Sequence, residues 1–358
     1  MQYRRRALLA ALGAGVLFVL VQLGALALVE PFRDAGFQAV EDPEDPTNSL
    51  LYVGFLLVVT AGMLLVIRLD ADWLLRAVLV GTAALLSWYV FAVLVGPLAD
   101  ALGVDGNWVA LALAAAFGVA LWAYPEWYVI DAAGVLMGAG AAGLFGISFG
   151  VLPAIVLLGA LAVYDALAVY RTKHMLTLAE GVMDLRVPVL LVFPLRADYS
   201  FRRGPPRGAG DEESSGGADD GDEGRAEADA AVPGDDTDAE AAGAGDDTDA
   251  EAAGAADDER DAFFIGLGDA VMPTIMVASA AAFLDVEPLV AGTALTLPAA
   301  GAMVGTLVGL AVLLHWVFRG RAHAGLPLLN GGAIGGYLVG ALAAGVPLAE
   351  ALGLASHL

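Results

Sequence analysis

Long apolar runs alternate with short polar connections along the chain. The runs are about twenty residues long, which is the length that an α-helix needs to cross the hydrocarbon core of a bilayer. Each run is predicted to form one transmembrane helix. The predicted spans are 7–29, 49–68, 73–96, 107–123, 128–147, 150–170, 263–285, 289–318 and 326–345. The pattern predicts an all-α polytopic membrane protein with nine transmembrane helices.

Two features leave the count of helices open. Only "YPEWY" (124–128) separates the fourth span from the fifth, and little more than "ISFG" (147–150) separates the fifth from the sixth, so eight helices is an alternative. The N-terminal "MQYRRR" also resembles the start of a signal peptide. The apolar stretch that follows extends to Val29 and no clear cleavage site comes after it, so we interpret it as a retained first helix.

Composition supports the membrane class. Hydrophobic residues make up 59% of the chain, charged residues 16%, and the mean hydropathy is +0.73. A soluble domain averages about 45–50% apolar and about 25% charged residues. The net charge of −24 argues against a nucleic-acid partner. The acidic chain has sixteen Arg and one Lys, which suggests a halophilic archaeal origin.

The reactive side chains are few. The absence of cysteine excludes a disulfide, a zinc–thiolate site and a cysteine nucleophile. The four histidines, at positions 174, 315, 323 and 357, form no metal-ligand spacing. We therefore expect no cofactor and no metal.

The distribution of basic residues predicts the orientation. Cytoplasmic loops of membrane proteins are enriched in Arg and Lys. With nine spans and a cytoplasmic N-terminus, sixteen of the seventeen basic residues lie inside and only Arg33 lies outside. Merging two spans would move Arg319 and Arg321 out. The C-terminus is therefore predicted to lie outside the cell membrane.

A polar segment divides the membrane part in two. Residues 202–261 consist mainly of Gly, Ala, Asp, Glu and Ser, and "GDDTDAEAAGA" occurs twice, at 234–244 and 245–255. Such a composition does not bury enough apolar surface to offset the entropy of ordering, so a disordered cytoplasmic linker is predicted. The predicted parts are then 1–201 with helices one to six, the linker, and 262–358 with helices seven to nine.

Two short segments precede the linker. "HMLTLAEGVMD" (174–184) is amphipathic and is predicted to lie at the membrane interface. "VPVLLVFPL" (187–195) is too short to span a bilayer. Its valines and flanking prolines favour an extended strand.

Aspartates within the predicted spans are the candidate functional residues. A charged side chain at the centre of a bilayer costs about 2.5–3.5 kcal/mol on insertion scales, so such residues are rare and mark functional sites. Asp165 lies in the sixth span and Asp269 in the seventh. Asp131 stands near the start of the fifth, where we expect it to reach the interface.

Asp165 and Asp269 are predicted to lie at a similar depth near the cytoplasmic face. Asp165 is six residues from the cytoplasmic boundary at Arg171, and Asp269 is eight residues beyond Asp261, or about 9 Å and about 12 Å at the helical rise. Two adjacent carboxyls in a low dielectric do not both ionise readily, so one retains a proton. This is the arrangement with which an aspartyl protease activates water.

Paired membrane aspartates also occur in transporters, which are a different class of protein. There they bind protons or cations, and interrupted helices suit that class. An inverted repeat between the two halves would favour a transporter, and none is visible in the sequence. A prepilin-type peptidase, another membrane aspartyl enzyme, is a further alternative, although nine spans and the pair Tyr164–Asp165 fit it poorly. A silent membrane scaffold would need neither aspartate for chemistry.

Three motifs in order resemble those of the presenilin and signal peptide peptidase family of intramembrane aspartyl proteases. They are "YD" at Tyr164–Asp165, "GLGD" at Gly266–Asp269, and Pro327-Leu328-Leu329 at the position of the family's Pro-Ala-Leu, with Leu in place of Ala. The resemblance implies that Asp165 and Asp269 are the catalytic pair. It also implies active-site shaping by Tyr164, Gly266, Leu267, Gly268, Pro327, Leu328 and Leu329.

The resemblance implies a substrate class as well. The partners would be transmembrane protein substrates within the lipid bilayer, and the arginine distribution favours the presenilin orientation over the inverted one of the signal peptide peptidases. The substrates would then be single-span proteins with their N-termini outside. Partner subunits are not indicated by the sequence.

The predicted topology has a direct test. A reporter fused after Leu358 should be detected outside the cell, and one inserted in 210–255 should be detected in the cytoplasm, because nine spans place the two sites on opposite sides. A cytoplasmic C-terminus would contradict the nine-span prediction.

Overall fold

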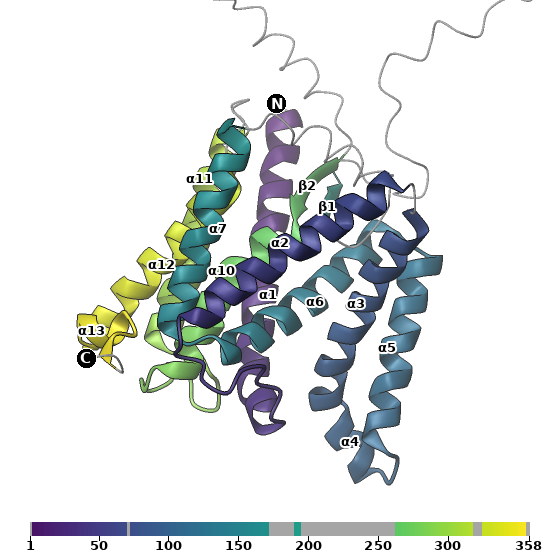
Figure 1. The fold of residues 1–358 in the computed structure, drawn as a ribbon, viewed down its shortest axis with the longest axis horizontal. Coiled ribbons are helices and arrows are strands. Elements are labelled where there is room, and N and C mark those ends of the chain that lie inside the picture. The colour runs from purple at the N-terminus through teal and green to yellow at the C-terminus, as the bar shows by residue number, and fades with distance from the viewer. Residues whose placement is uncertain (1, 70–71, 172–189, 195–261, 318–323, 356–358) are drawn as a thin grey trace, which may run out of the picture. The chain divides into compact units, whose positions relative to one another are not determined.

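The computed structural model describes residues 2–69, 72–171, 190–194, 262–317 and 324–355, and these residues are mostly helical (Figure 1). Among the described residues, six helices are long and apolar enough to cross a membrane: α1 (Gln2–Asp34), α3 (Asp72–Leu94), α5 (Gly106–Ala123), α6 (Trp127–Ser148), α11 (Leu297–Val317) and α12 (Gly325–Ala343). Shorter apolar stretches lie in α2 (Thr47–Arg68), α7 (Val151–Arg171) and α10 (Leu267–Phe283). The chain is a multi-pass membrane protein, while the count of nine spans stays a prediction.

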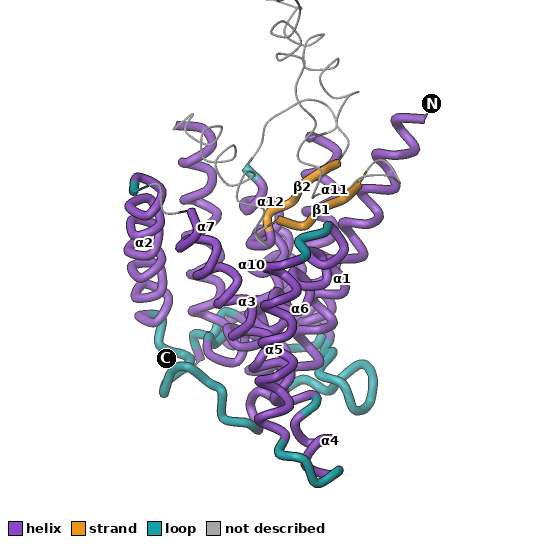
Figure 2. The backbone as a smooth tube through the Cα atoms, turned by 90° about the vertical axis from the view of Figure 1, so that its right-hand side faces the viewer, coloured by secondary structure: helices purple, strands orange, loops and turns teal. Residues whose placement is uncertain are grey.

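The remaining elements are short. Two small helices, α4 (Gly96–Ala101) and α13 (Leu348–Ala351), are additional to the predicted spans. Strands β1 (Leu190–Pro194) and β2 (Ala262–Gly266) pair antiparallel, with Val192 opposite Phe264. The two strands lie at the end of the bundle where the chain begins (Figure 2). In the part of the chain that the structure describes, this two-stranded ribbon departs from the all-α prediction.

The structure confirms some predicted boundaries and corrects others. Strand β1 confirms the extended segment predicted within 187–195. The helix predicted from residue 263 is wrong at its start, because 262–266 pair with β1 and the helix begins at Leu267. The helix predicted from residue 289 likewise begins only at Leu297. The amphipathic segment 174–184 and the acidic linker lie outside the described residues.

Helix α10 is the central element of the bundle. It packs against α1, α6, α7, α11 and α12. All of its residues from Ala270 to Ala280, apart from Met272, are buried, with Ile275, Met276, Val277 and Ala278 fully so. Because α10 begins immediately after β2, its position also fixes where the ribbon meets the bundle.

Glycines bring α11 and α12 into direct backbone contact. A Cβ on Gly305 would lie 2.0 Å from the carbonyl oxygen of Gly332, and one on Gly301 would lie 2.3 Å from that of Gly336. A Cβ on Gly309 would lie 2.4 Å from the carbonyl oxygen of Leu328, near the N-terminus of α12. Small residues at every fourth position allow helices to approach this closely in lipid. The contact fixes α12 rigidly on α11.

Arg33 has a structural reason for being the one basic residue predicted outside. Its guanidinium donates to the carbonyl oxygen of Ala282 near the C-terminal end of α10, and lies 5.6 Å from the ring centroid of Phe283. A cation is favourable at a helix C-terminus, where carbonyl groups lack partners. Arg33 thus joins α1 to the end of α10.

The glycine contact predicts a contrast between two adjacent residues. Gly332→Ala should lower the free energy of unfolding by about 1–3 kcal/mol, because the methyl group would overlap the Gly305 backbone. Gly331→Ala should leave it unchanged or raise it by up to about 1 kcal/mol, because a Cβ there meets no described atom within 4 Å and alanine favours helix. Denaturant unfolding in detergent measures both. Equal effects would contradict the close backbone contact between α11 and α12.

Candidate active site

Asp165 lies on the face of α7 that packs into the bundle. Ala154, Leu158 and Leu161 are buried on this face, and Asp165 continues it at helical spacing. The helix packs against α12, α10 and α2, and Asp165 itself is partly buried. The apolar stripe therefore turns the carboxylate inward, away from lipid.

The N-terminus of α12 meets this carboxylate. The backbone N–H of Leu326 donates to Oδ2 of Asp165 at 3.1 Å, and the N–H of Gly325 faces the same carboxylate. The first four N–H groups of a helix have no partner within it, so they require acceptors from elsewhere. Asp165 is an acceptor supplied by another helix, and the partial positive charge of the helix N-terminus favours its negative charge.

Asp269 reaches the same point from α10. It stands in the first turn of that helix, three residues after β2 ends at Gly266, and is partly buried. A Cβ on Gly325 would lie 3.7 Å and 3.8 Å from its two carboxylate oxygens. Asp269 also interacts electrostatically with Asp165. The two aspartates therefore converge on Gly325 and Leu326.

The residues of the "GLGD" segment differ in their surroundings. A Cβ on Gly266 would lie 3.4 Å from Oδ2 of Asp269, so the glycine allows the carboxylate to lie against the backbone. Leu267 packs on α6 near Gly138 and belongs to the core. Gly268 is exposed, and no described atom lies within 4 Å of a Cβ placed there. Open space therefore adjoins Asp269 at Gly268.

The other predicted site residues lie on α7 and α12. Tyr164 is 51% exposed, and within the described ranges no hydrogen bond joins its side chain to either aspartate. Pro327, Leu328 and Leu329 form part of the first turns of α12, with Leu329 fully buried. Gly309 of α11 contacts the Leu328 carbonyl, so the glycine contact fixes this segment beside the aspartates.

Sequence reasoning missed Asn330. The side chain is fully buried, and its Nδ2 donates to the carbonyl oxygen of Leu158 on α7 at 3.0 Å. Its Oδ1 is buried with no hydrogen-bond partner among the described residues. The signal that could have found it was an amide four residues after Leu326 in an apolar helix. Asn330 and Leu326 together join α12 to α7 at two points.

The prediction for Asp131 is wrong. It does not reach the interface, since it is only 8% exposed and its Oδ1 accepts the N–H of Val192 in β1 at 2.7 Å. The side chain thus belongs to the interior, on the side of the ribbon opposite β2.

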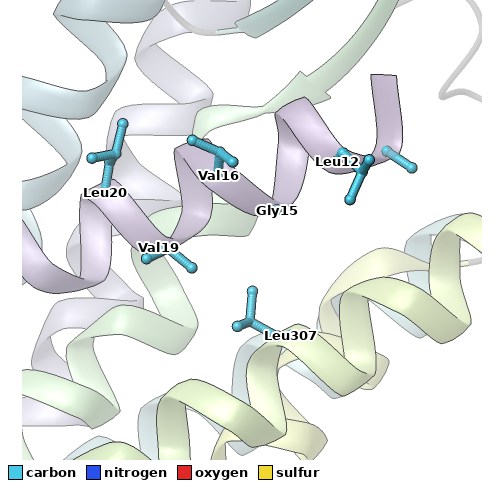
Figure 3. Close-up of a pocket in the computed structure, with 7 residues that line it drawn as sticks. Leu12, Gly15, Val16, Val19, Leu20 and Leu307 are labelled. Atoms are coloured by element: carbon cyan, nitrogen blue, oxygen red, sulfur yellow. The ribbon is translucent and has the colours of Figure 1, made fainter. Parts of the chain in front are cut away.

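An apolar hollow between α1 and α11 is a poor candidate for the active site (Figure 3). Its volume is about 320 Å³, and its lining is aliphatic, with Val16 and Leu20 on one side and Leu307 on the other. Among the described residues, no polar side chain lines it to orient a substrate. In the part of the chain that the structure describes, no three His, Asp or Glu side chains gather to hold a metal ion.

The comparisons with known proteins agree with the geometry. The family model for signal-peptide peptidase and presenilin aspartyl proteases matches residues 15–346. The chain belongs to this family. No curated protein matches it.

Two solved structures are similar over nearly the whole chain. Both are described as a presenilin family intramembrane aspartate protease, in space groups C222 and P2, and each is 34% identical to this chain. The first has a TM-score of 0.60 and the second 0.55. The alignments cover 93% of this chain and 99% or 97% of the solved chain. The predicted enzyme class, an aspartic endopeptidase, is confirmed, and nothing in the comparisons supports a transporter.

Asn330 should affect activity more than stability. Asn330→Leu keeps the side-chain volume, and the Leu158 carbonyl that loses its donor is still part of helix α7. An interhelical hydrogen bond of this kind contributes about 0.6 kcal/mol. Stability should therefore stay within about 1 kcal/mol. Proteolytic activity should fall about tenfold or more, because a displacement of about 1 Å at a catalytic site costs up to about 100-fold.

Ser279→Ala is the matched control. Ser279 is also fully buried and donates to a backbone carbonyl, that of Phe149 at 2.9 Å, but stands about 15 Å along α10 from Asp269. Its loss should leave turnover unchanged. Equal loss of turnover in both variants, measured per folded enzyme, would show that Asn330 has no particular role at the site.

Proposed function

We propose that this chain hydrolyses peptide bonds within the transmembrane segments of single-span proteins, and that Asp165 and Asp269 are its catalytic dyad. The observation that carries the proposal is the convergence of both carboxylates, from α7 and α10, on the N-terminus of α12. Membership of an aspartyl protease family supports it.

The chemistry requires one proton shared between the two carboxyls. The ionised carboxylate takes a proton from water as the oxygen attacks the scissile carbonyl carbon, and the neutral carboxyl donates its proton to the carbonyl oxygen. The tetrahedral intermediate then collapses: the C–N bond breaks, the carboxyl that took the proton from water gives it to the leaving amine, and the other carboxylate takes back the proton of a hydroxyl on the intermediate. The N–H groups of Gly325 and Leu326 orient Asp165 during these steps.

A substrate has to be extended at the cleavage point, because a helix shields its peptide bonds. The ribbon offers a surface for such a segment, since a strand edge recognises an extended peptide by backbone hydrogen bonds. Strand β2 ends three residues before Asp269, and the open space at Gly268 adjoins it. The predicted orientation favours substrates with their N-termini outside.

The dyad is tested by conservative replacement. Asp165→Asn and Asp269→Asn should each abolish cleavage of a single-span substrate in liposomes, because an amide neither takes nor gives the proton that each step transfers. Membrane insertion and folding should persist. Wild-type activity should follow a bell-shaped pH profile whose two limbs belong to the pair.

A second measurement addresses binding. A transition-state mimic with a hydroxyl in place of the scissile carbonyl should bind the wild type and lose affinity in both variants. Near-normal turnover in either variant would refute the dyad. Ion flux that vanished with the same changes, without proteolysis, would favour a transporter instead.

A further inference from the structure

Asp131 is a third intramembrane carboxylate, and the proposed chemistry does not use it. It is 8% exposed on α6, and its described hydrogen bond is the one from the N–H of Val192, at 2.7 Å. A carboxylate is a costly group to bury in a membrane protein. Its position therefore calls for a role at the ribbon.

The surface around Asp131 is shaped to hold β1. One helical turn further along α6, a Cβ on Gly134 would lie 2.6 Å from Cδ2 of Leu191, so the glycine makes room for that side chain. On α1, a Cβ on Gly13 would lie 3.4 Å from the ring of Phe193. Leu191, Val192 and Phe193 are all buried. Strand β1 is thus covered by α6 and α1.

The hydrogen bond of Asp131 determines which edge of the ribbon is closed. Val192 pairs with Phe264, and the N–H of Val192 points to Asp131. The two residues therefore form a non-hydrogen-bonded pair, in which the N–H and C=O of each residue point away from the partner strand. The N–H and C=O of Phe264 therefore point to the far side of β2. That edge continues through Gly266 towards Asp269.

We propose that Asp131 is a positioning residue: by accepting the N–H of Val192 it closes the outer edge of β1 and anchors the ribbon on α6, which holds β2 and the start of α10 in place beside Asp269. The inference rests on the proposed function. Asp131 acts here as a hydrogen-bond acceptor. A backbone edge left unpaired is a template for a further strand, and occupying it with a side chain prevents that pairing. The anchor also sets the register of the substrate relative to the dyad.

Two replacements separate the acceptor from the charge. Asp131→Leu removes the acceptor at similar volume, whereas Asp131→Asn keeps an oxygen that accepts the same N–H. Gly134→Ala is an independent variant that displaces β1 through Leu191 without changing Asp131. Gly15→Ala on α1 is the control, because no described atom lies within 4 Å of a Cβ there.

The first readout does not depend on catalysis. Hydrogen–deuterium exchange of the peptide that contains 190–194 should speed up about tenfold or more in Asp131→Leu, since the opened amide loses its protection. Gly134→Ala should show the same direction of change, while Asp131→Asn and Gly15→Ala should match the wild type. Unchanged exchange in Asp131→Leu would refute the anchor, whatever the outcome for the dyad.

The second readout is the cleavage pattern of a single-span substrate. With active sites counted by a tight-binding transition-state mimic, kcat/KM should fall about tenfold or more in Asp131→Leu, because misplaced substrate reacts slowly. Mass spectrometry should show cleavage spread over neighbouring peptide bonds in Asp131→Leu and Gly134→Ala. A purely structural role would reduce the number of active sites and leave the pattern unchanged.

Two results would overturn the proposal. One is a wild-type cleavage pattern in both Asp131→Leu and Gly134→Ala. The other is an Asp131→Asn enzyme as impaired as Asp131→Leu, which would make the charge the decisive property. If Asp131→Leu fails to fold, Gly134→Ala alone decides, by its exchange and its cleavage pattern. Cleavage that survives Asp165→Asn or Asp269→Asn would refute the dyad and leave the exchange test of the anchor valid.

Discussion

A helix that begins inside a membrane protein must find acceptors for its first N–H groups, and α12 finds one in Asp165. Water satisfies such groups at a protein surface, but the hydrocarbon interior supplies none. The hydrogen bond from Leu326 to Asp165 also stabilises the carboxylate, because a carboxylate in a low dielectric needs hydrogen-bond donors. One contact thus satisfies two groups that would each be costly alone, and it places a candidate catalytic carboxylate at a helix terminus.

The same solution recurs at Asp131. There the donor is the N–H of Val192, an edge group of a strand instead of a helix terminus. In both cases an aspartate is tolerated because it accepts a backbone N–H that has no partner in its own element. The difference is what lies beside the bond. Asp165 adjoins a second aspartate, whereas Asp131 lies on the covered side of the ribbon.

Rigidity around the site comes from packing. Backbone contact between glycines fixes α12 on α11, Asn330 ties α12 to α7, and the buried α10 brings Asp269 to the same point. Precise placement matters for the proposed reaction, because proton transfer to and from water needs short, aligned contacts. The strand-to-helix change at Gly266 then puts a backbone edge next to Asp269, a member of the proposed dyad, without a long loop between them.

The sequence by itself determined the membrane class, most of the helices, the strand within 187–195 and the candidate aspartates. These follow from local properties: the length of an apolar run, β-branched content, and the rarity of a carboxylate in lipid. Family motifs added the residues around Asp269. The apolar run from residue 263 did not reveal that it starts with a strand. In a short segment, hydrophobicity alone does not distinguish a strand from a helix.

Only the tertiary structure decided the rest. The start of α10 at Leu267 depends on pairing with β1, and the burial of Asp131 depends on Val192, sixty-one residues away in the chain. The bonds of Leu326 to Asp165 and of Asn330 to Leu158 join residues separated by 161 and 172 positions. A single sequence carries no direct record of such pairs, since each is selected by how distant helices pack together. The partners of these polar side chains therefore depend on tertiary packing and not on any local sequence pattern.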